Sequence, residues 1–311
     1  MVHGRFRHVG RVGHVIDIPD GLVENQYTYA GEAGRAFVAG LPLLVEEYVE
    51  RWGLTVDGAP MHGMAALVLP VVRRADGVRA AVKFQVLDEE TEGEPVALRV
   101  WGGDGAVRLL DHDAATGTML LERLDSGRML SSVEDSRKAV LVIAELLARL
   151  TSRPAPDGMR RLSDIAARMI AEVPGALGEI ADPQQRGIVA DCAAALREVA
   201  ADGAGDRLLH WDLHFENVLA AVDGREPWLA IDPKPLAGDP GFDLWPALDN
   251  RFEPQDVVWR FEAMADVLGL DRERARGWTL GRLVQNALWD VEDGRALSPD
   301  HLETARRLLG R

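Results

Sequence analysis

A short polar segment in the second half of the chain constrains the possible folds more than any other feature. It places Asp212 five residues before Asn217 and then delivers Asp232 at the end of the apolar run 228–231. Apolar residues also flank the first part of this segment, and such runs predict short buried strands. Three acidic or amide side chains would therefore project from strand ends into a common space.

This set of side chains suits phosphoryl transfer. One carboxylate can sit near an acceptor hydroxyl and take its proton, while an amide oxygen and a second carboxylate hold magnesium against nucleotide phosphates. Two other interpretations stay open at this point. The segment could be a polar loop of an ordinary domain. Alternatively, His210, Asp212 and His214 share one face of a strand and could form the metal centre of a hydrolase, which would leave Asn217 unexplained.

The composition indicates a two-lobed protein that remains inside the cell. The chain has 311 residues, which exceeds one average domain, and 47% of them are hydrophobic. Its only cysteine is Cys192, so we expect no disulfide or thiol metal site, and a reducing compartment is favoured. Residues 1–14 lack a hydrophobic signal region, and no apolar run is long enough to cross a membrane. We expect a cytoplasmic monomer.

The net charge of −15 restricts the partners. It argues against nucleic acid, because an acidic protein and a phosphate backbone repel each other. It is compatible with a cationic small molecule, although most acidic side chains are simply solvated surface. We expect neither nucleic acid nor a membrane as a partner.

The hydrophobic pattern changes near residue 124. Before it, the pattern predicts a helix over 32–52 interrupted near Pro42, strands over 54–56, 65–72 and 78–86, a helix over 88–101, and strands over 107–111 and 118–123. After it, helices dominate, over 133–150, 162–173, 184–199, 256–268, 274–292 and 299–309. We therefore predict an α+β fold in three parts: a disordered extension 1–16, a small antiparallel sheet lobe 17–124 that binds nucleotide, and a larger, mainly helical lobe 125–311 that carries the catalytic loop and binds the acceptor.

Lys83 lies in the middle of a predicted strand, and the chain has only three lysines. A buried ammonium group is costly unless it is paired. Phosphate oxygens and a carboxylate from the following helix would both pair it. Glu94 is the favoured partner, with Glu90 and Glu92 as competitors, and an edge-strand lysine pointing to water is the ordinary alternative.

Weaker signals suggest other nucleotide contacts. Gly63 lies in a loop between predicted strands that could cover phosphates, although the chain has no Gly-x-Gly-x-x-Gly or Walker A sequence and an ordinary turn fits equally well. Glu122 and Leu124 lie at the predicted lobe junction and could present backbone groups to an adenine base.

Candidate acceptor contacts lie near the end of the chain. Asn286, Trp289, Asp290 and Asp293 follow the spacing i, i+3, i+4, i+7 and would form one stripe of a helix. This stripe is either a solvated polar face or a wall that offers carboxylates and an indole to a cation. Asp239 could line the same acceptor pocket, or it could be a turn aspartate before proline.

Several motifs together resemble a known family. The lysine strand, Leu120-Leu-Glu-Arg-Leu, the loop His210-Trp-Asp-Leu-His-x-Glu-Asn and Ile231-Asp-Pro look like those of an aminoglycoside phosphotransferase. Further stretches are similar to the streptomycin 6-phosphotransferase branch, grouped with hydroxyurea phosphotransferases: Gly40-Leu-Pro-x-Leu-Val, Arg51-Trp, Leu98-Arg-x-Trp-x-Gly-Asp-Gly, Arg108-Leu-Leu, Trp228-Leu-Ala-Ile-Asp-Pro and Gly238-Asp-Pro-Gly-Phe-Asp-Leu-Trp. The resemblance runs from about residue 17 to the C-terminus.

The resemblance implies a bilobal protein-kinase-like fold and a kinase that uses ATP and magnesium. It implies Asp212 as the catalytic base, Asn217 and Asp232 as magnesium ligands, and Lys83 with Glu94 as the groups that position the nucleotide phosphates. The implied acceptor is a hydroxyl of streptomycin, at position 6 of the streptidine ring. Such a kinase would inactivate the antibiotic and confer resistance.

Two alternatives to this function stay open. A kinase of the same fold could act on hydroxyurea or another small hydroxylated metabolite, and the acidic stripe would then be irrelevant. A non-catalytic protein could bind the nucleotide only as a sensor, although the intact set of lysine, aspartates and asparagine argues against this. Pro233 follows the second aspartate where protein kinases have Phe-Gly, so no mobile activation segment is expected.

Overall fold

The computed structural model describes residues 16–311, and the predicted extension over 1–16 lies almost entirely outside them. The chain divides into two compact units. The first holds the described residues up to Arg99 together with Val107–Leu124. The second holds Val100–Ala106 and Asp125–Arg311, so one short segment from the first half of the chain belongs to it.

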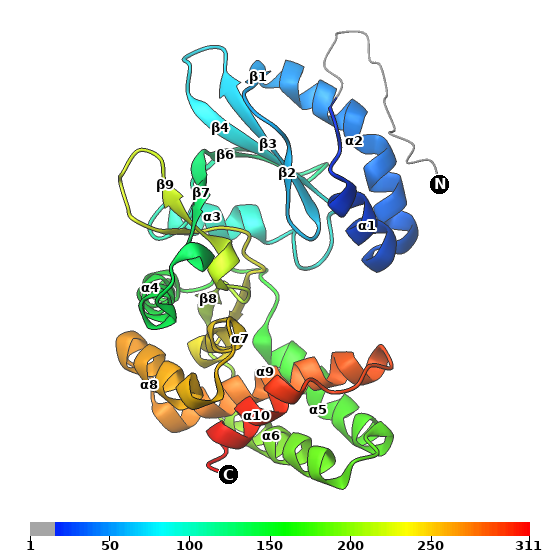
Figure 1. Cartoon of the computed structure of the whole chain (residues 1–311), viewed down its shortest axis with the longest axis vertical. Helices are drawn as coiled ribbons and strands as arrows, with labels where there is room; N and C mark the ends of the chain where they lie inside the picture. Colours follow the sequence, from blue (N-terminus) through cyan, green and yellow to red (C-terminus); the bar gives the residue numbers. More distant parts are fainter. Residues whose placement is uncertain (1–15) are drawn as a thin grey trace. The chain divides into compact units, whose positions relative to one another are not determined.

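The first unit is built on an antiparallel sheet with the strand order β1-β3-β4-β6-β5, and β2 pairs with β3 at one end (Figure 1). Alternating apolar residues of β3 and β4, among them Leu67, Leu69, Val82 and Phe84, are buried on one face of this sheet. The strands are β1 (Leu54–Val56), β2 (Met61–His62), β3 (Ala66–Arg73), β4 (Arg79–Gln85), β5 (Leu109–Asp113) and β6 (Thr118–Glu122). All but β2 were predicted within a few residues.

Helices α1 (Asp20–Tyr29) and α2 (Gly31–Arg51) belong to this unit, and α1 was not predicted. The predicted interruption of α2 is wrong, because the helix continues through Pro42. The proline removes one intrahelical hydrogen bond. The helix survives because Leu41 and Val45, on either side of the proline, are buried in one cluster with the sheet residues.

Helix α3 (Glu94–Trp101) is shorter than the predicted 88–101. The Asp88 carboxylate accepts hydrogen bonds of 2.9 Å from the backbone N–H groups of Glu90 and Thr91. This local bonding offers the backbone an alternative to the helix, so residues 89–93 form turns.

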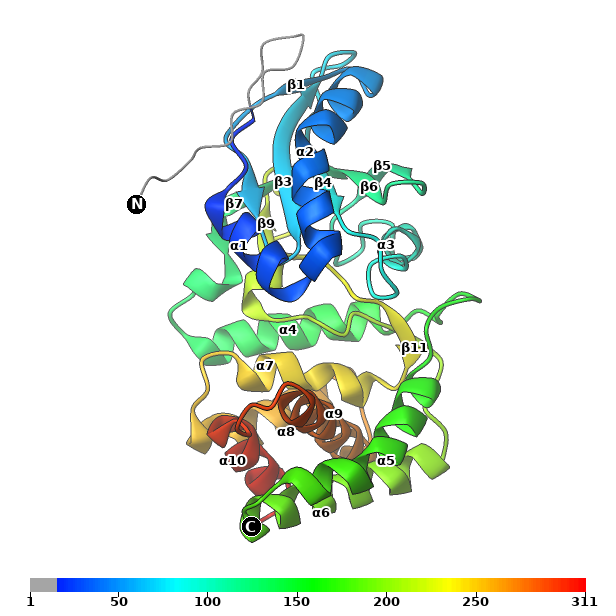
Figure 2. The ribbon, with the colours of Figure 1, turned by 90° about the vertical axis from the view of Figure 1, so that its right-hand side faces the viewer.

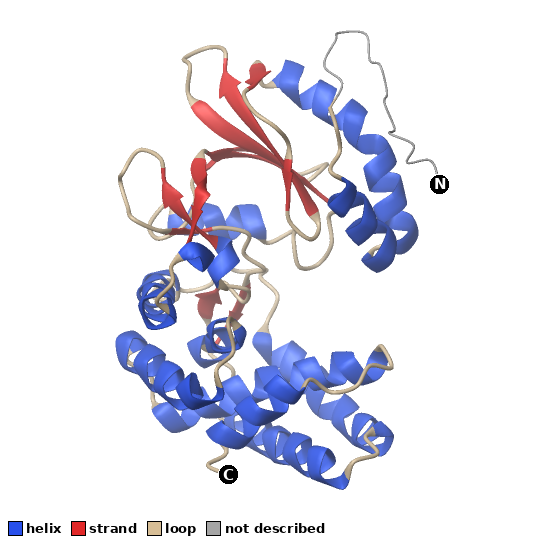
Figure 3. Cartoon of the chain, viewed as in Figure 1, coloured by secondary structure: helices blue, strands red, loops and turns tan. Residues whose placement is uncertain are grey.

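The second unit is mainly helical, as the colours of Figure 3 show. Helix α6 packs against α5 (Figure 2) and against α9. Helix α4 packs against α8. The helices are α4 (Ser136–Leu150), α5 (Leu162–Glu179), α6 (Pro183–Ala201), α7 (Trp245–Asp249), α8 (Val257–Leu268), α9 (Arg272–Glu292) and α10 (Pro299–Leu308), with 3₁₀ turns η1 (Leu130–Ser132), η2 (Phe215–Asn217), η3 (Pro240–Leu244) and η4 (Pro254–Asp256). Aspartate side chains at Asp135, Asp182 and Asp271 cap three of these helices by accepting N–H groups of the first turn.

Two small antiparallel sheets interrupt the helices of this unit. Strand β9 (Val218–Ala221) pairs with β10 (Leu229–Ala230) and lies next to β7 (Leu124–Met129). Strand β8 (Arg207–Leu209) pairs with β11 (Leu236–Gly238). The short strands predicted around the polar segment are therefore present, whereas β7 and β11 were not predicted.

Among the residues that the structure describes, each helix is too short or too polar to cross a membrane.

The continuity of α2 through Pro42 can be tested with two leucines of the same helix. Leu41 is 0% exposed and Leu43 is 65% exposed. Leu41→Ala should lower the free energy of unfolding by about 2–5 kcal/mol, because it removes buried methyl groups and leaves a cavity. Leu43→Ala is the matched control and should change it by less than about 0.5 kcal/mol. Equal losses in chemical denaturation would contradict the helical register described here.

Candidate active site

The polar segment is held in an uncommon backbone conformation. Trp211 and Asp232 have φ angles of 67° and 55°, in the left-handed region that non-glycine residues rarely adopt. Each such residue costs roughly 1–2 kcal/mol. Strained backbone of this kind persists only where surrounding contacts hold it, and it is concentrated at functional sites.

Asp243 fixes the backbone at the start of this segment. Its two carboxylate oxygens accept hydrogen bonds from the backbone N–H groups of His210, at 2.8 Å, and Trp211, at 2.7 Å. Burial raises the pKa of Asp243 to about 7, and the two backbone hydrogen bonds oppose that rise. Asp243 therefore has a structural role, because it binds the backbone amides of the loop.

His210 connects the loop to the strand that leads to Asp232. The ring is fully buried, and its Nε2 lies 3.1 Å from the carbonyl oxygen of Ile231. Burial lowers the pKa of His210 to about 3, so the ring is neutral and donates its Nε2 proton to that carbonyl. The Trp101 ring stacks on it with a centroid separation of 6.1 Å.

The geometry disfavours a hydrolase metal centre. The His210 ring is used in structural hydrogen bonds, so it is unavailable as a metal ligand. Across residues 16–311, the structure contains no group of three or more His, Cys, Asp or Glu side chains that could hold a metal ion.

Asp212 is a partly exposed carboxylate in this loop. Its side chain is 34% exposed, so a bound molecule can reach it. Burial raises the pKa of Asp212, and the nearby charge of Asp232 adds to the rise, whereas His214, Arg282 and Lys234 lower it. Its carboxylate lies 4.0 Å from Nε2 of His214.

Asn217 and Asp232 fit the requirements of a magnesium site. The Asn217 Nδ2 donates a hydrogen bond of 2.9 Å to the backbone carbonyl of Asp212, so Oδ1 is the atom left to act as a metal ligand. The backbone N–H of Ile231 donates to the Asn217 carbonyl at 2.9 Å, which places Asp232 next to this strand pair. Amide and carboxylate oxygens are the ligands that magnesium prefers, with phosphates and waters completing the shell.

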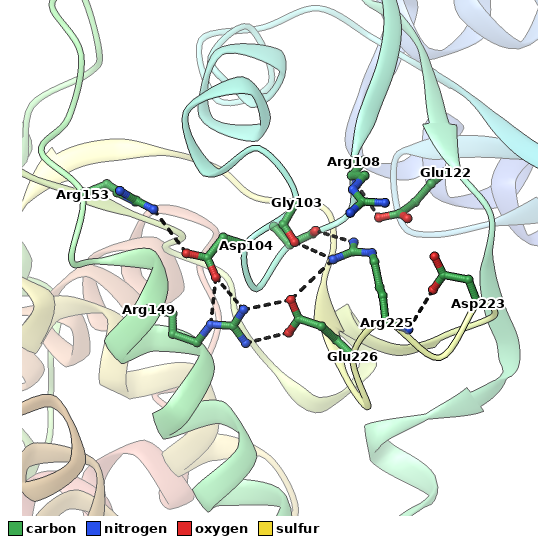
Figure 4. A network of polar contacts seen from close by, with 10 residues as sticks. Gly103, Asp104, Arg108, Glu122, Arg149, Arg153, Asp223, Arg225 and Glu226 are labelled. Carbon is green, nitrogen blue, oxygen red and sulfur yellow. Dashed lines mark hydrogen bonds and ion pairs between the residues drawn. The ribbon is translucent and has the colours of Figure 1, made fainter.

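A polar network supports the hairpin that delivers Asp232. Figure 4 shows Arg149 of α4 between Asp104 and Glu226. Its guanidinium donates to both carboxylate oxygens of Glu226, at 2.6 and 2.9 Å, and this pairing raises the pKa of Arg149. Arg225 donates to the backbone carbonyl of Gly103 at 2.6 Å. The Trp-x-Gly-Asp-Gly motif of residues 101–105 thus belongs to the second unit and supports β10, a role that its sequence did not reveal.

The predicted lysine pair is present in the first unit. Nζ of Lys83 lies 2.8 and 2.6 Å from the two carboxylate oxygens of Glu94, and both side chains are buried. Gln85 donates a further hydrogen bond of 2.9 Å to the same carboxylate. The structure therefore identifies Glu94 as a lysine partner, in agreement with the favoured assignment.

Three other predicted nucleotide contacts lie in or beside the sheet. Gly63 follows β2 and donates its N–H to the Ala66 carbonyl in a tight hairpin. A Cβ at Gly63 would meet nothing within 4 Å, so the hairpin itself does not require glycine. Glu122 ends β6 and accepts a hydrogen bond of 2.7 Å from the Arg108 N–H (Figure 4). Leu124 begins β7 and is buried. Their roles toward a nucleotide stay predictions.

Asp239 is occupied by structural contacts. Its carboxylate accepts a hydrogen bond from the Gly241 N–H at 2.9 Å and lies 2.6 Å from Nε of Arg274. It therefore caps η3, the segment that carries Asp243. This geometry favours the turn interpretation over contact with an acceptor.

Three residues of the predicted stripe, Asn286, Trp289 and Asp290, line a surface pocket together with Trp245, Asp249 and His301, whereas Asp293 does not. Trp289 is 39% exposed, and Asn286 is half-buried beside it. Arg295 pairs with both Asp290, at 3.1 Å, and Asp293, at 2.7 Å. The sequence interpretation overlooked this arginine, which offsets part of the negative charge.

Sequence reasoning also missed Arg282 and Arg160 beside the loop. Arg282 lies four residues before Asn286 and seven before Trp289, so it continues the predicted stripe along α9. That spacing could have identified it. Arg160 comes from the irregular segment before α5, and only the folded chain brings it to Trp211.

Comparison with known proteins identifies the family. A family model described as aminoglycoside/hydroxyurea antibiotic resistance kinase matches residues 51–294. A hydroxyurea phosphotransferase of Kitasatospora aureofaciens is 62% identical, with 97% of this chain and 88% of that protein covered. A streptomycin 6-kinase of Streptomyces glaucescens is 55% identical, with 95% and 98% covered.

Solved structures agree on the fold. An aminoglycoside phosphotransferase APH(4)-Ia in a ternary complex with ADP and hygromycin B matches with a TM-score of 0.56 at 14% identity, covering 85% of this chain and 96% of that one. The choline kinase LicA of Streptococcus pneumoniae matches with a TM-score of 0.52 at 16% identity, covering 88% and 98%.

The chain belongs to the aminoglycoside/hydroxyurea antibiotic resistance kinase family. It is therefore a phosphotransferase with a protein-kinase-like α+β fold, and both the predicted family and the predicted fold class are confirmed.

The position of Asp212 predicts a specific loss of activity. Asp212→Asn preserves shape but cannot accept a proton, so turnover should fall by about 10²–10⁴-fold, with an unchanged thermal midpoint. Asp206→Asn, which changes an exposed carboxylate just before β8, is the matched control and should keep full turnover. Near-normal turnover of Asp212→Asn in an ADP-release assay would remove Asp212 from the role of base.

Proposed function

We propose that this protein transfers the γ-phosphoryl group of ATP, with magnesium, to a hydroxyl of a streptomycin-type aminoglycoside, at position 6 of the streptidine ring. The reaction would inactivate the antibiotic and confer resistance. The observation that carries the proposal is the arrangement of the loop. Asp212 is partly exposed, and its backbone carbonyl accepts a hydrogen bond from the Asn217 amide nitrogen, which leaves the amide oxygen for a metal. Asp232 follows Ile231, whose N–H bonds the Asn217 carbonyl.

The chain's own residues would divide the chemistry among them. Asp212 orients the acceptor hydroxyl and accepts its proton as the new P–O bond forms. Asn217 Oδ1 and the Asp232 carboxylate would hold magnesium, which neutralises phosphate charge when bound. The Lys83 ammonium, oriented by Glu94, contacts phosphate oxygens of the nucleotide.

The α9 pocket supports a cationic acceptor. Asp290 and Asp249 contribute carboxylates, and Trp245 and Trp289 contribute aromatic rings, to one surface depression. One charge pair at 4 Å in an effective dielectric of about 20 gives roughly 4 kcal/mol of attraction before desolvation. Arg295 would have to exchange its carboxylate partners with the guanidinium groups of such an acceptor. Relatives named streptomycin 6-kinase, 54% and 55% identical, support the same choice.

A second acceptor class is hydroxyurea or a similarly small hydroxylated molecule. The relative that is 62% identical is named hydroxyurea phosphotransferase. In addition, Arg282 and Lys234 act electrostatically on Asp212. Basic side chains this close to the proposed base are compatible with an uncharged acceptor.

An acceptor panel separates these functions. The wild-type protein should release ADP with ATP, magnesium and streptomycin, and mass spectrometry should show one added phosphoryl group on the antibiotic. Asp290→Asn should raise the KM for streptomycin several-fold without changing turnover of hydroxyurea. Turnover of hydroxyurea alone would select the second class. Nucleotide binding without transfer to any acceptor would favour the sensor interpretation.

The Lys83 pair predicts separable effects on stability and nucleotide use. Lys83→Met leaves Glu94 buried without its cation and should cost about 3–5 kcal/mol of stability. The double variant Lys83→Met with Glu94→Gln removes both charges, so it should regain most of that stability while the KM for ATP stays high. A double variant with normal ATP kinetics would show that the pair is structural only.

A further inference from the structure

Trp211 lies immediately before Asp212, the proposed base. Two arginine side chains pack against its indole ring. The Arg160 Cζ lies 4.5 Å and the Arg282 Cζ 4.8 Å from the ring centroid. The Trp211 residue is only 4% exposed. Tryptophan is the strongest aromatic partner for a guanidinium, and the attraction grows when the pair is removed from water.

Both arginines are anchored by contacts of their own. Nη2 of Arg160 donates to the backbone carbonyl of Lys234 at 3.2 Å. Arg282 is buried and donates through Nη1 to Oε1 of Gln285 on the same helix. The Arg282 guanidinium also lies 5.5 Å from the centroid of the Trp289 ring. Side chains from two separate segments are therefore fixed against one indole.

The backbone of Trp211 requires such support. Its φ of 67° is unfavourable for any residue with a Cβ. The bond from its N–H to Asp243 holds one end of the residue, but it does not hold the side chain. The direction of the Asp212 carboxylate depends on this peptide, because the two residues are adjacent.

We propose that Arg160 and Arg282 clamp the Trp211 indole and thereby position the Asp212 carboxylate toward the acceptor. Their contacts reach Asp212 through Trp211, so they are positioning residues. The Arg282 charge also acts on Asp212 directly, and a lysine at position 282 keeps that charge. This inference rests on the proposed function, because it requires Asp212 to be the base. The planar guanidinium is essential to it, since a lysine ammonium supplies the charge without a flat surface to stack.

The two proposed magnesium ligands are linked through the backbone. Asn217 and Asp232 are tied together by the backbone bond between Ile231 and Asn217, which involves neither arginine. Loosening the indole should therefore misdirect the base and leave nucleotide binding intact. Displacements of about 1 Å at a reacting group can cost about 10²-fold in rate.

The test compares Arg282→Gln, Arg160→Gln and Arg282→Lys with the wild-type protein, using ADP release with the acceptor that the wild type turns over best. Both glutamine variants should lower kcat by about 10–10²-fold, with the KM for ATP and for the acceptor within about twofold of wild type. Arg282→Lys should recover little of the lost kcat. Arg276→Gln is the matched control: Arg276 lies on the same helix, with its guanidinium 5.7 Å from the Phe261 ring, and its loss should leave kcat unchanged.

Each outcome decides the inference. An unchanged kcat in the glutamine variants overturns it, and so does a raised acceptor KM at normal kcat, which would mean acceptor binding. Full recovery of kcat by Arg282→Lys overturns the stacking argument, because charge alone would then suffice.

If Arg282→Gln does not fold, the kcat of Arg160→Gln decides alone. If the wild-type protein is active and the glutamine variants have the same kcat, only the clamp is refuted. A wild-type protein inactive with every acceptor refutes the proposed function and the clamp with it.

Discussion

The site depends on the buried carboxylate of Asp243. It accepts the N–H groups of two consecutive loop residues, which would otherwise be buried polar groups without partners. Asp243 itself lies in η3, which Asp239 caps and Arg274 secures. A chain of polar contacts thus runs from α9 through η3 to the loop that carries Asp212. Asp239 and Asp243 therefore support the loop, and the partly exposed aspartate of the loop is Asp212.

The carboxylates of the two units differ in whether a cation lies within hydrogen-bond distance of them. Asp104 and Glu226 are paired with Arg149, and Glu94 is paired with Lys83. Asp212 has no such pairing within hydrogen-bond distance among the described residues, and its side chain is partly exposed. A carboxylate with a raised pKa and an open face is suited to exchanging a proton with a bound hydroxyl.

One face of helix α9 carries a basic side chain near its middle and acidic side chains near its C-terminal end. Arg282, at the middle of the helix, contacts the Trp211 ring, whereas Asp290 and Asp293 lie about two and three turns further on and share Arg295. The same face therefore combines basic groups near the proposed base with acidic groups farther away. Relatives at 62% and 55% identity are named for hydroxyurea and for streptomycin. We expect the balance between these basic and acidic groups to decide acceptor choice.

The sequence alone determined the fold class, the family and the residues of the loop, because their spacing and flanking apolar runs are local features. It also indicated Lys83 and Glu94, since a mid-strand lysine requires a partner nearby in the chain. It misjudged α2 at Pro42, where tertiary packing outweighed local propensity. It also misjudged the start of α3, where the Asp88 turn replaces the first helical residues.

Only the tertiary structure revealed Arg149, Arg160 and Arg282 as supports, because their partners lie far along the chain. The tertiary structure also shows that Asp239 caps η3 and contacts Arg274. The sequence alone allowed either a turn aspartate or a contact with the acceptor at this position.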